Sequence, residues 1–106
     1  MTRAVVCGAL GRMGKAILRL SLEYSDFQVV AGVEHPDCIR SPDLGTASGI
    51  EELKGLALTS RLEEVLPLCD VVIEFSGNTT AAVSHAKLSA LAGKGVVIGT
   101  TGFSSQ

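Results

Sequence analysis

The sequence contains few aromatic residues: no tryptophan, one tyrosine and three phenylalanines among 106 residues. Because 46% of the residues are nonetheless hydrophobic, the apolar side chains are mostly aliphatic, which is typical of strands packed closely between helices. The length fits one ordinary domain and is too short for two. A chain of this length can bury a core without disulfides or a structural metal, so we expect a single domain and no metal site.

Clustered positive charge and long apolar segments are also missing. The formal net charge is −2 and the nine basic residues are scattered, which argues against a nucleic-acid-binding face because phosphate contacts require grouped Lys and Arg. No run of eighteen apolar residues occurs, so we expect no membrane span. The N-terminal apolar stretch is too short for a signal peptide, and we therefore expect a cytoplasmic protein.

Cysteine is scarce as well. Cys7, Cys38 and Cys69 are odd in number and widely separated, with no CxxC pair. This pattern fits reduced thiols in a cytosolic protein rather than a disulfide framework. We expect two of the three thiols to be buried beside strands.

Strand-like and helix-like patterns alternate along the chain. That alternation predicts a parallel sheet with crossover helices, which is a Rossmann-type, doubly wound α/β fold with three αβα layers in a single domain. The expected strands are Arg3–Cys7, Phe27–Glu34, Leu56–Thr59, Asp70–Phe75 and Gly95–Ile98, and the expected long helices are Arg12–Tyr24 and Thr79–Ala92.

The first predicted helix carries apolar residues at intervals of four, three and four, which predicts that this stripe faces the core. Its members are Met13, Ile17, Leu20 and Tyr24.

The span from His35 to Gly55 is rich in Pro, Gly and acidic residues, and we expect it to be irregular apart from a helical turn near Ile50–Leu53. Ser60 with Glu63 predicts a capping box for a short helix that ends near Leu68. The chain stops soon after its last predicted strand, which would leave a sheet edge uncovered. We therefore expect residues 1–106 to be a truncated dinucleotide-binding domain.

A glycine-rich turn, GALGRMG at residues 8–14, connects the first strand to the first helix. Gly8, Gly11 and Gly14 meet the needs of a phosphate-binding turn: a tight reversal, close backbone approach to a ligand, and close helix packing. The N-terminus of the helix adds unpaired N–H groups and partial positive charge. The spacing is GxxGxxG, one residue longer than the usual GxGxxG, so the pattern alone is a weaker signal.

Glu34 stands twenty positions after Gly14, at the end of the second predicted strand. An acid at this place can accept hydrogen bonds from the ribose hydroxyls of a dinucleotide. The alternative is an ordinary tight turn followed by a solvated strand end. The succession of strand, turn, amphipathic helix, strand and acid favours the dinucleotide site.

Doubly wound sheets bind ligands where the strand order reverses, here between the carboxyl ends of the first and fourth strands. The fourth strand ends at residues 75–78, Phe-Ser-Gly-Asn, and the fifth ends at residues 99–102, Gly-Thr-Thr-Gly. Either segment can be a plain turn. Their position at this edge favours contact with a cofactor.

Three segments together resemble the dihydrodipicolinate reductase family: GALGRMG at residues 8–14, DVVIEFS at residues 70–76 and VIGTTGF at residues 97–103. The resemblance runs over nearly the whole chain. It implies an NADH- or NADPH-dependent oxidoreductase, usually a homotetramer, that reduces a cyclic imine dicarboxylate to tetrahydrodipicolinate in lysine and diaminopimelate biosynthesis.

The resemblance also implies roles for residues. The pyrophosphate would be wrapped by Gly8, Ala9, Leu10, Gly11, Arg12 and Met13, the ribose held by Glu34, the crevice lined by Phe75 and Ser76, and the nicotinamide flanked by Gly99, Thr100 and Thr101. Many members carry Arg after the ribose acid, where it pairs with the 2′-phosphate of NADPH. His35 stands at that position, and a mostly neutral imidazole compensates a phosphate less well than a guanidinium. We therefore expect a preference for NADH.

The family's His-His-x-x-Lys motif, which supplies the proton and binds the dicarboxylate substrate, is absent from these 106 residues. His85 falls inside a predicted helix, away from any predicted strand end, and we expect a surface or packing residue rather than an acid catalyst. The chain should therefore bind cofactor without turnover, with no catalytic residue of its own and with a C-terminal substrate and tetramerisation domain missing.

Three other functions remain open at this point. The chain could be the cofactor domain of a homoserine or aspartate dehydrogenase, a non-catalytic NAD(H)-sensing module, or an α/β domain that binds no nucleotide.

Overall fold

The computed structural model describes residues 1–99. The expectations for Thr100 and Thr101 therefore lie outside the described residues. The strands are β1 (Thr2–Cys7), β2 (Phe27–Val33), β3 (Ala57–Thr59), β4 (Val71–Glu74) and β5 (Gly95–Ile98), and the α-helices are α1 (Arg12–Ser21), α2 (Leu44–Ser48) and α3 (Thr79–Leu91). Short 3₁₀ helices occupy η1 (Pro36–Cys38), η2 (Glu51–Leu53), η3 (Leu62–Glu64) and η4 (Leu66–Leu68).

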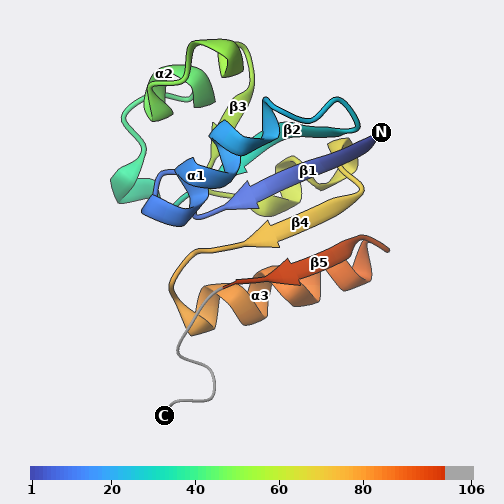
Figure 1. The fold of residues 1–106 in the computed structure, drawn as a ribbon. Coiled ribbons are helices and arrows are strands. Elements are labelled where there is room, and N and C mark those ends of the chain that lie inside the picture. Colours follow the sequence, from blue (N-terminus) through green and yellow to red (C-terminus); the bar gives the residue numbers. More distant parts are fainter. Residues whose placement is uncertain (100–106) are drawn as a thin grey trace.

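The strands form one parallel sheet with the order β3-β2-β1-β4-β5 (Figure 1). Strand β1 is central: Val5 pairs with Ala31 of β2 on one side and with Val72 of β4 on the other. The order reverses between β1 and β4, as expected for a doubly wound fold. The predicted fold class and all five predicted strands are confirmed, with ends shifted by at most one residue.

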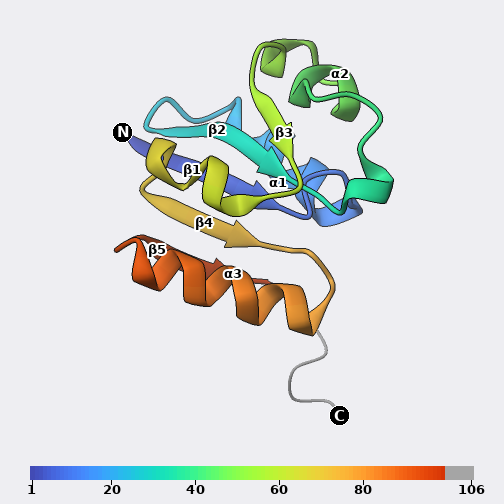
Figure 2. The same ribbon diagram turned by 180° about the vertical axis from the view of Figure 1, so that it is seen from behind.

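Both faces of the sheet are covered, which gives three layers (Figures 1 and 2). Val5 and Val6 are both fully buried, because successive strand residues point to opposite faces and each face here has its own core. One core lies under α1, α2 and η2, and the other lies under η3, η4 and α3. The second core includes Cys7 and Cys69, whereas Cys38 is exposed, so the prediction of two buried thiols is confirmed.

The predicted core stripe of α1 is wrong for three of its four residues; Ile17 is partly buried and packs against the core. Met13 and Leu20 are exposed, as is Tyr24, which lies beyond the end of the helix. The buried face consists instead of Gly14, Leu18 and Ser21. The physical reason is that α1 approaches β1 through Gly14, and residues at i+4 and i+7 from Gly14 then share its face.

The connection between β2 and β3 is more regular than predicted. The turn expected near residues 50–53 is present as η2, but the helix α2 was not predicted. Asp43 caps α2 by accepting a hydrogen bond from the N–H of Thr46 at 2.8 Å, and Gly49 ends it with a positive φ of 78°. Both devices are ordinary helix terminators, but they enclose only five residues, too few for a periodic pattern.

The predicted capping box at Ser60 is also wrong. Residues 60–68 form the two 3₁₀ turns η3 and η4 rather than one helix. The first turn is supported by Thr59, whose hydroxyl oxygen accepts from the N–H of Arg61 at 3.2 Å. Pro67 at the start of η4 cannot donate a backbone hydrogen bond, which favours the break into two short turns.

Among the helices of residues 1–99, none combines the length and the hydropathy that crossing a membrane requires.

Two leucines of α1 test which face of the helix packs against the sheet. Leu18 is fully buried, whereas Leu20 is 45% exposed. Leu18→Ala should therefore lower the free energy of unfolding by about 2–5 kcal/mol through loss of burial and a residual cavity. Leu20→Ala should change it by less than about 1 kcal/mol. Urea unfolding of both variants measures the difference, and equal losses would contradict the observed helix orientation.

Candidate functional site

The glycine turn between β1 and α1 requires residues without a side chain at two positions. Gly8 has a φ of +79°, and a Cβ there would lie 2.2 Å from the carbonyl oxygen of Phe75. A Cβ on Gly14 would lie 2.0 Å from the carbonyl oxygen of Gly8. The first contact brings the turn against the end of β4, and the second brings α1 against the turn. Two of the three glycine roles expected from the sequence thus correspond to observed contacts.

Helix α1 begins directly behind this turn. Gly11 occupies its N-cap position and has no side chain that could accept from the N–H groups of the first turn. Those groups lack partners inside the helix and carry partial positive charge. Arg12 and Met13 form the exposed start of the helix, whereas the Ala9 side chain is fully buried. The whole Ala9 residue is buried, and its N–H donates to the carbonyl of Val33 at 3.3 Å.

Glu34 links the glycine turn to the end of β2. Its Oε2 accepts from the N–H of Leu10 at 3.0 Å, and its Oε1 accepts from the N–H of His35 at 3.0 Å. The backbone N–H of Glu34 donates to the carbonyl of Thr59 at 3.0 Å, which ties the same residue to the end of β3. The carboxylate is therefore held at the carboxyl ends of the strands, between the glycine turn and His35.

His35 is oriented by the turn that follows it. Its Nδ1 accepts from the N–H of Asp37 at 3.1 Å and so caps η1. An Nδ1 that accepts carries no hydrogen, so Nε2 is the ring nitrogen that can donate in this arrangement. The Asp37 carboxylate lies 3.6 Å from the same Nδ1 and is largely exposed. The Arg40 guanidinium belongs to the same turn, where its Nη1 donates to the carbonyl of Asp37 at 2.7 Å, so acidic and basic groups both follow Glu34.

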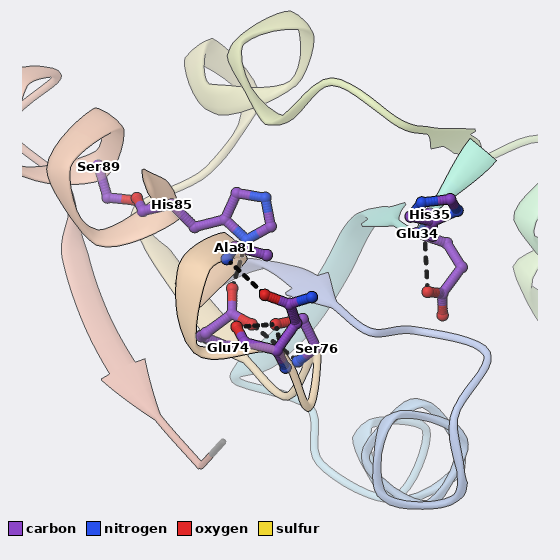
Figure 3. Close-up of polar contacts among 8 residues, drawn as sticks. Glu34, His35, Glu74, Ser76, Ala81, His85 and Ser89 are labelled. Atoms are coloured by element: carbon purple, nitrogen blue, oxygen red, sulfur yellow. Dashed lines mark hydrogen bonds and ion pairs between the residues drawn. The ribbon is translucent and has the colours of Figure 1, made fainter. Parts of the chain in front are cut away.

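A second carboxylate, Glu74, lies at the end of β4 with its side chain fully buried. Its Oε2 accepts from the N–H of Ser76 at 2.7 Å, and its Oε1 lies 2.5 Å from the Nδ1 of His85 on α3 (Figure 3). Burial alone would raise the pKa of Glu74, but the hydrogen bonds from His85 and Ser76 hold that pKa below the usual value of a glutamate. Glu74 is therefore a buried carboxylate that remains ionised.

Cys7 lies next to this pair. Its sulfur, a Glu74 oxygen and a His85 nitrogen all lie within 4.8 Å of one another. Burial, together with the adjacent charge of Glu74, raises the pKa of the Cys7 thiol well above its ordinary value. Since Glu74 and His85 are already directly paired, the three groups form a hydrogen-bonded cluster. The expectation of no metal site remains a prediction.

A cleft of about 240 Å³ lies at the carboxyl ends of β1, β2 and β4, and His85 is the member of this cluster that lines it. The cleft brings together four residues predicted from the sequence, Gly8, Glu34, His35 and Ser76, and its other lining residues are Val33, Pro36, Ser60, Asn78, Ala81 and His85. Phe75 and Gly99 also meet, because a Cβ on Gly99 would overlap the Phe75 ring at 1.8 Å.

The expectation that His85 lies away from any strand end is wrong. The crossover from β4 to β5 runs α3 back along the sheet, which brings His85 over the end of β4, with 16% of its side chain exposed. The sequence signal was available in Glu74: an acid inside an otherwise apolar strand requires a buried partner. Its identity could not be read from the sequence, because that partner is eleven residues away.

The five-stranded parallel sheet, with a glycine turn at its point of reversal, places the chain in the class of Rossmann-type α/β domains. A family model described as dihydrodipicolinate reductase, N-terminus, matches residues 2–106. The chain belongs to this family.

Curated relatives support this assignment. The chain is 67% identical over 104 residues to 4-hydroxy-tetrahydrodipicolinate reductase of Aquifex aeolicus, covering 98% of this chain and 39% of the relative. It is 44% identical over 107 residues to the enzyme of the same name from Anaeromyxobacter dehalogenans, covering 97% and 38%. The chain thus spans roughly two-fifths of the length of these relatives.

Two solved structures share the fold. Aspartate semialdehyde dehydrogenase with NADP from Candida albicans aligns with a TM-score of 0.79 at 20% identity, covering 95% of this chain and 30% of that protein. Dipicolinate-bound dihydrodipicolinate reductase from Paenisporosarcina sp. TG-14 aligns with a TM-score of 0.72 at 22% identity, covering 98% and 39%. At these identities the likeness concerns the fold alone.

The close contact at Gly14 predicts a sharp difference between two glycines of the turn. Gly14→Ala should lower the free energy of unfolding by about 2–4 kcal/mol, because the new Cβ would overlap backbone that cannot move aside. Gly11→Ala is the matched control, since its Cβ would meet only the Gly8 oxygen at 3.4 Å. Its cost should be about 1 kcal/mol or less. Similar urea midpoints for both variants would contradict the contact.

Proposed function

We propose that this chain binds a nicotinamide dinucleotide and is the cofactor-binding domain of a dihydrodipicolinate reductase. The observation that carries the proposal is the hydrogen bond between the Glu34 carboxylate and the N–H of Leu10 inside the glycine turn. It holds a ribose-binding acid against a phosphate-binding turn, which is the arrangement that a dinucleotide needs. Family membership supports the same assignment.

In this proposal the pyrophosphate lies against residues 8–13 and the N-terminus of α1, where backbone N–H groups and the helix dipole favour an anion. Glu34 accepts hydrogen bonds from the ribose hydroxyls. The cleft beside it, lined by His35, Ala81 and His85, takes the adenosine half. Gly99, with Thr100 and Thr101 by family resemblance, flanks the nicotinamide, and Phe75 and Ser76 line the crevice between the two halves.

The local charge supports a preference for NADH. His35 uses its Nδ1 as an acceptor, and the carboxylates of Glu34 and Asp37 flank it. A 2′-hydroxyl could donate to Glu34, whereas a 2′-phosphate would meet that carboxylate. The Arg40 guanidinium is engaged with the Asp37 carbonyl, and a guanidinium at position 35 itself would pair more directly with a 2′-phosphate.

In the whole enzyme the bound nicotinamide would supply hydride to a cyclic imine dicarboxylate. The role of residues 1–99 would be to hold and orient the cofactor, and the dicarboxylate and its proton would be handled by a further domain. The relatives are about two and a half times as long as this chain, which leaves room for such a domain. A homotetramer in the cytoplasm also remains a prediction.

Family membership favours this function over the alternatives of a homoserine or aspartate dehydrogenase or an NAD(H)-sensing module. It also favours it over an α/β domain that binds no nucleotide.

Calorimetric titration with NADH and thermal unfolding test the binding proposal. NADH at about 100 times its dissociation constant should add roughly 2.7 kcal/mol of stability. Glu34→Gln should weaken NADH binding about tenfold, because the glutamine side chain has one acceptor oxygen where the carboxylate has two. Glu52→Gln removes an exposed acid on η2 and is the matched control. No stabilisation by NADH or NADPH would contradict the proposal.

The cofactor preference is tested by adding a fixed charge. His35→Arg should raise NADPH affinity about tenfold or more, because a guanidinium can pair with the 2′-phosphate, and should leave NADH affinity nearly unchanged. Gln28→Arg adds the same charge at the exposed start of β2 and should have little effect. Wild-type binding of NADPH at least as tight as that of NADH would show that the preference is wrong.

A further inference from the structure

Glu74 connects the two chain segments that follow β4 and β5. Its side-chain Oε2 accepts from the N–H of Ser76 at 2.7 Å (Figure 3), and its backbone carbonyl accepts from the N–H of Gly99 at 2.8 Å. The side chain is fully buried, so water does not compete for its hydrogen bonds. One buried residue therefore holds both of the segments that the proposed function places beside the nicotinamide and the crevice next to it.

The N–H of Ser76 belongs to the peptide group that joins Phe75 to Ser76. A trans peptide is planar and its N–H and C=O point in opposite directions, so the contact with Glu74 directs the Phe75 carbonyl away from the carboxylate. The carbonyl oxygen lies against the glycine turn, 2.2 Å from the place that a Cβ on Gly8 would occupy. The peptide is thus held on two sides, by Glu74 at its N–H and by the α-carbon of Gly8 at its carbonyl.

The negative charge of Glu74 favours this orientation over the reverse. A carboxylate has only acceptors, so the reversed peptide would turn its carbonyl oxygen toward a buried anion, which is unfavourable. A glutamine side chain has the same shape but offers both an acceptor and a donor, so it could pair with either orientation. The carboxylate, unlike the amide, therefore selects one orientation of the peptide.

The orientation of this peptide determines the turn that follows it. The Ser76 hydroxyl donates to the carbonyl of Asn78 at 3.3 Å, across Gly77 with its positive φ of 72°. Asn78 then caps α3 by accepting from the N–H of Ala81 at 3.0 Å. Ser76, Asn78 and Ala81 all line the cleft. Reversal of the peptide before Ser76 would therefore displace groups that the turn presents to a ligand.

The end of β5 depends on the same peptide through Phe75. The N–H of Phe75 donates to the carbonyl of Cys7 at 2.8 Å, which fixes the residue on β1. Its ring fills the space beside Gly99, where a Cβ would lie 1.8 Å from the ring. The ends of β4 and β5 are therefore positioned together, and Glu74 contacts the backbone of both.

The glycine turn has other contacts that hold it in place. The N–H of Gly8 donates to the carbonyl of Val33 at 2.8 Å, and the N–H of Leu10 donates to the Glu34 carboxylate at 3.0 Å. Neither contact involves Glu74. The proposed sites for the pyrophosphate and the adenosine ribose should therefore survive a change at residue 74.

We propose that Glu74 is a positioning residue that holds the peptide between Phe75 and Ser76 in one orientation and so prepares the ends of β4 and β5 for the nicotinamide half of the dinucleotide. This inference rests on the proposed function for its ligand. The adenosine half and the pyrophosphate are bound by Glu34 and the glycine turn. The contribution of Glu74 is therefore specific to one half of the cofactor.

Two ligands separate the halves in a calorimetric titration, because NADH contains both and ADP contains only the adenosine and the pyrophosphate. In Glu74→Gln the peptide can adopt either orientation, and a ligand that requires one of them loses affinity in proportion to the fraction lost. NADH should bind about three- to tenfold more weakly, whereas the affinity for ADP should change by less than about twofold.

Asp70→Asn is the matched control for Glu74→Gln. Asp70 is a carboxylate at the other end of β4, where it pairs with Arg3 at 3.1 Å. Removal of its charge should leave the affinities for NADH and ADP unchanged.

Amide NMR of the wild-type chain tests the same arrangement without a substitution. The Ser76 N–H should exchange with solvent at least about tenfold more slowly than an unprotected amide, because it donates to a buried carboxylate. NADH should shift the amide signal of Gly99 much more than ADP does. These two measurements decide the proposal if Glu74→Gln does not fold.

Equal weakening of NADH and ADP binding in Glu74→Gln would overturn the inference, because Glu74 would then support the whole site rather than one half of it. Unchanged NADH affinity would also overturn it, as would a Ser76 N–H that exchanges freely or equal shifts of Gly99 with both ligands. None of these results affects the proposed function, which fails instead if the wild-type chain binds neither NADH nor NADPH.

Discussion

The contact between Gly14 and the carbonyl oxygen of Gly8 governs the geometry of the whole ligand-binding edge. A side chain on Gly14 would place its Cβ 2.0 Å from that oxygen, so the helix can pack this closely only because the side chain is absent. Close packing fixes the rotation of α1 and directs its N-terminal N–H groups toward the end of the sheet. Leu18 is buried and Leu20 exposed as a result.

The same contact positions the acids around the turn. Because the turn is held against β4 by Gly8 and against α1 by Gly14, the N–H of Leu10 lies within reach of Glu34 at the end of β2. The Glu34 carboxylate is stabilised beside this turn because two backbone N–H groups donate to it. Glu74 is compensated in a different way, by a side chain from α3. Both acids can therefore stay ionised near the cleft.

The sequence was informative where local pattern and tertiary structure agree. Strands buried on both faces produce apolar runs such as residues 71–73, and the five strands were found on that basis. The glycine turn and Glu34 were found because their spacing along the chain reflects one βαβ unit. Phe75 and Gly99 were found from their position after the fourth and fifth strands, and the structure brings them into contact.

The errors have a common physical origin. The apolar stripe from Met13 to Tyr24 has the helical period, but the face of α1 that packs on the sheet is set by Gly14. A glycine adds no hydrophobic side chain, so a search for apolar periodicity does not detect it. The short helix α2 is defined by a cap at Asp43 and a glycine terminator, not by periodicity. His85 was misplaced because its partner is eleven residues away, a separation that only the β4–α3 crossover closes. Sequence patterns report short-range order, and these features depend on close approach between elements.

The two histidines of the chain show most clearly why residue type alone does not determine the chemistry of this site. Both line the same cleft, and both use Nδ1 for a short-range contact. The Nδ1 of His35 accepts from a backbone N–H, which requires that nitrogen to be unprotonated. The Nδ1 of His85 faces a carboxylate, which requires it to be protonated. The neighbours therefore assign opposite hydrogen-bonding roles to identical side chains. The Nδ1 of His35 thus supports a local turn, whereas the Nδ1 of His85 engages a buried carboxylate from another element of the fold.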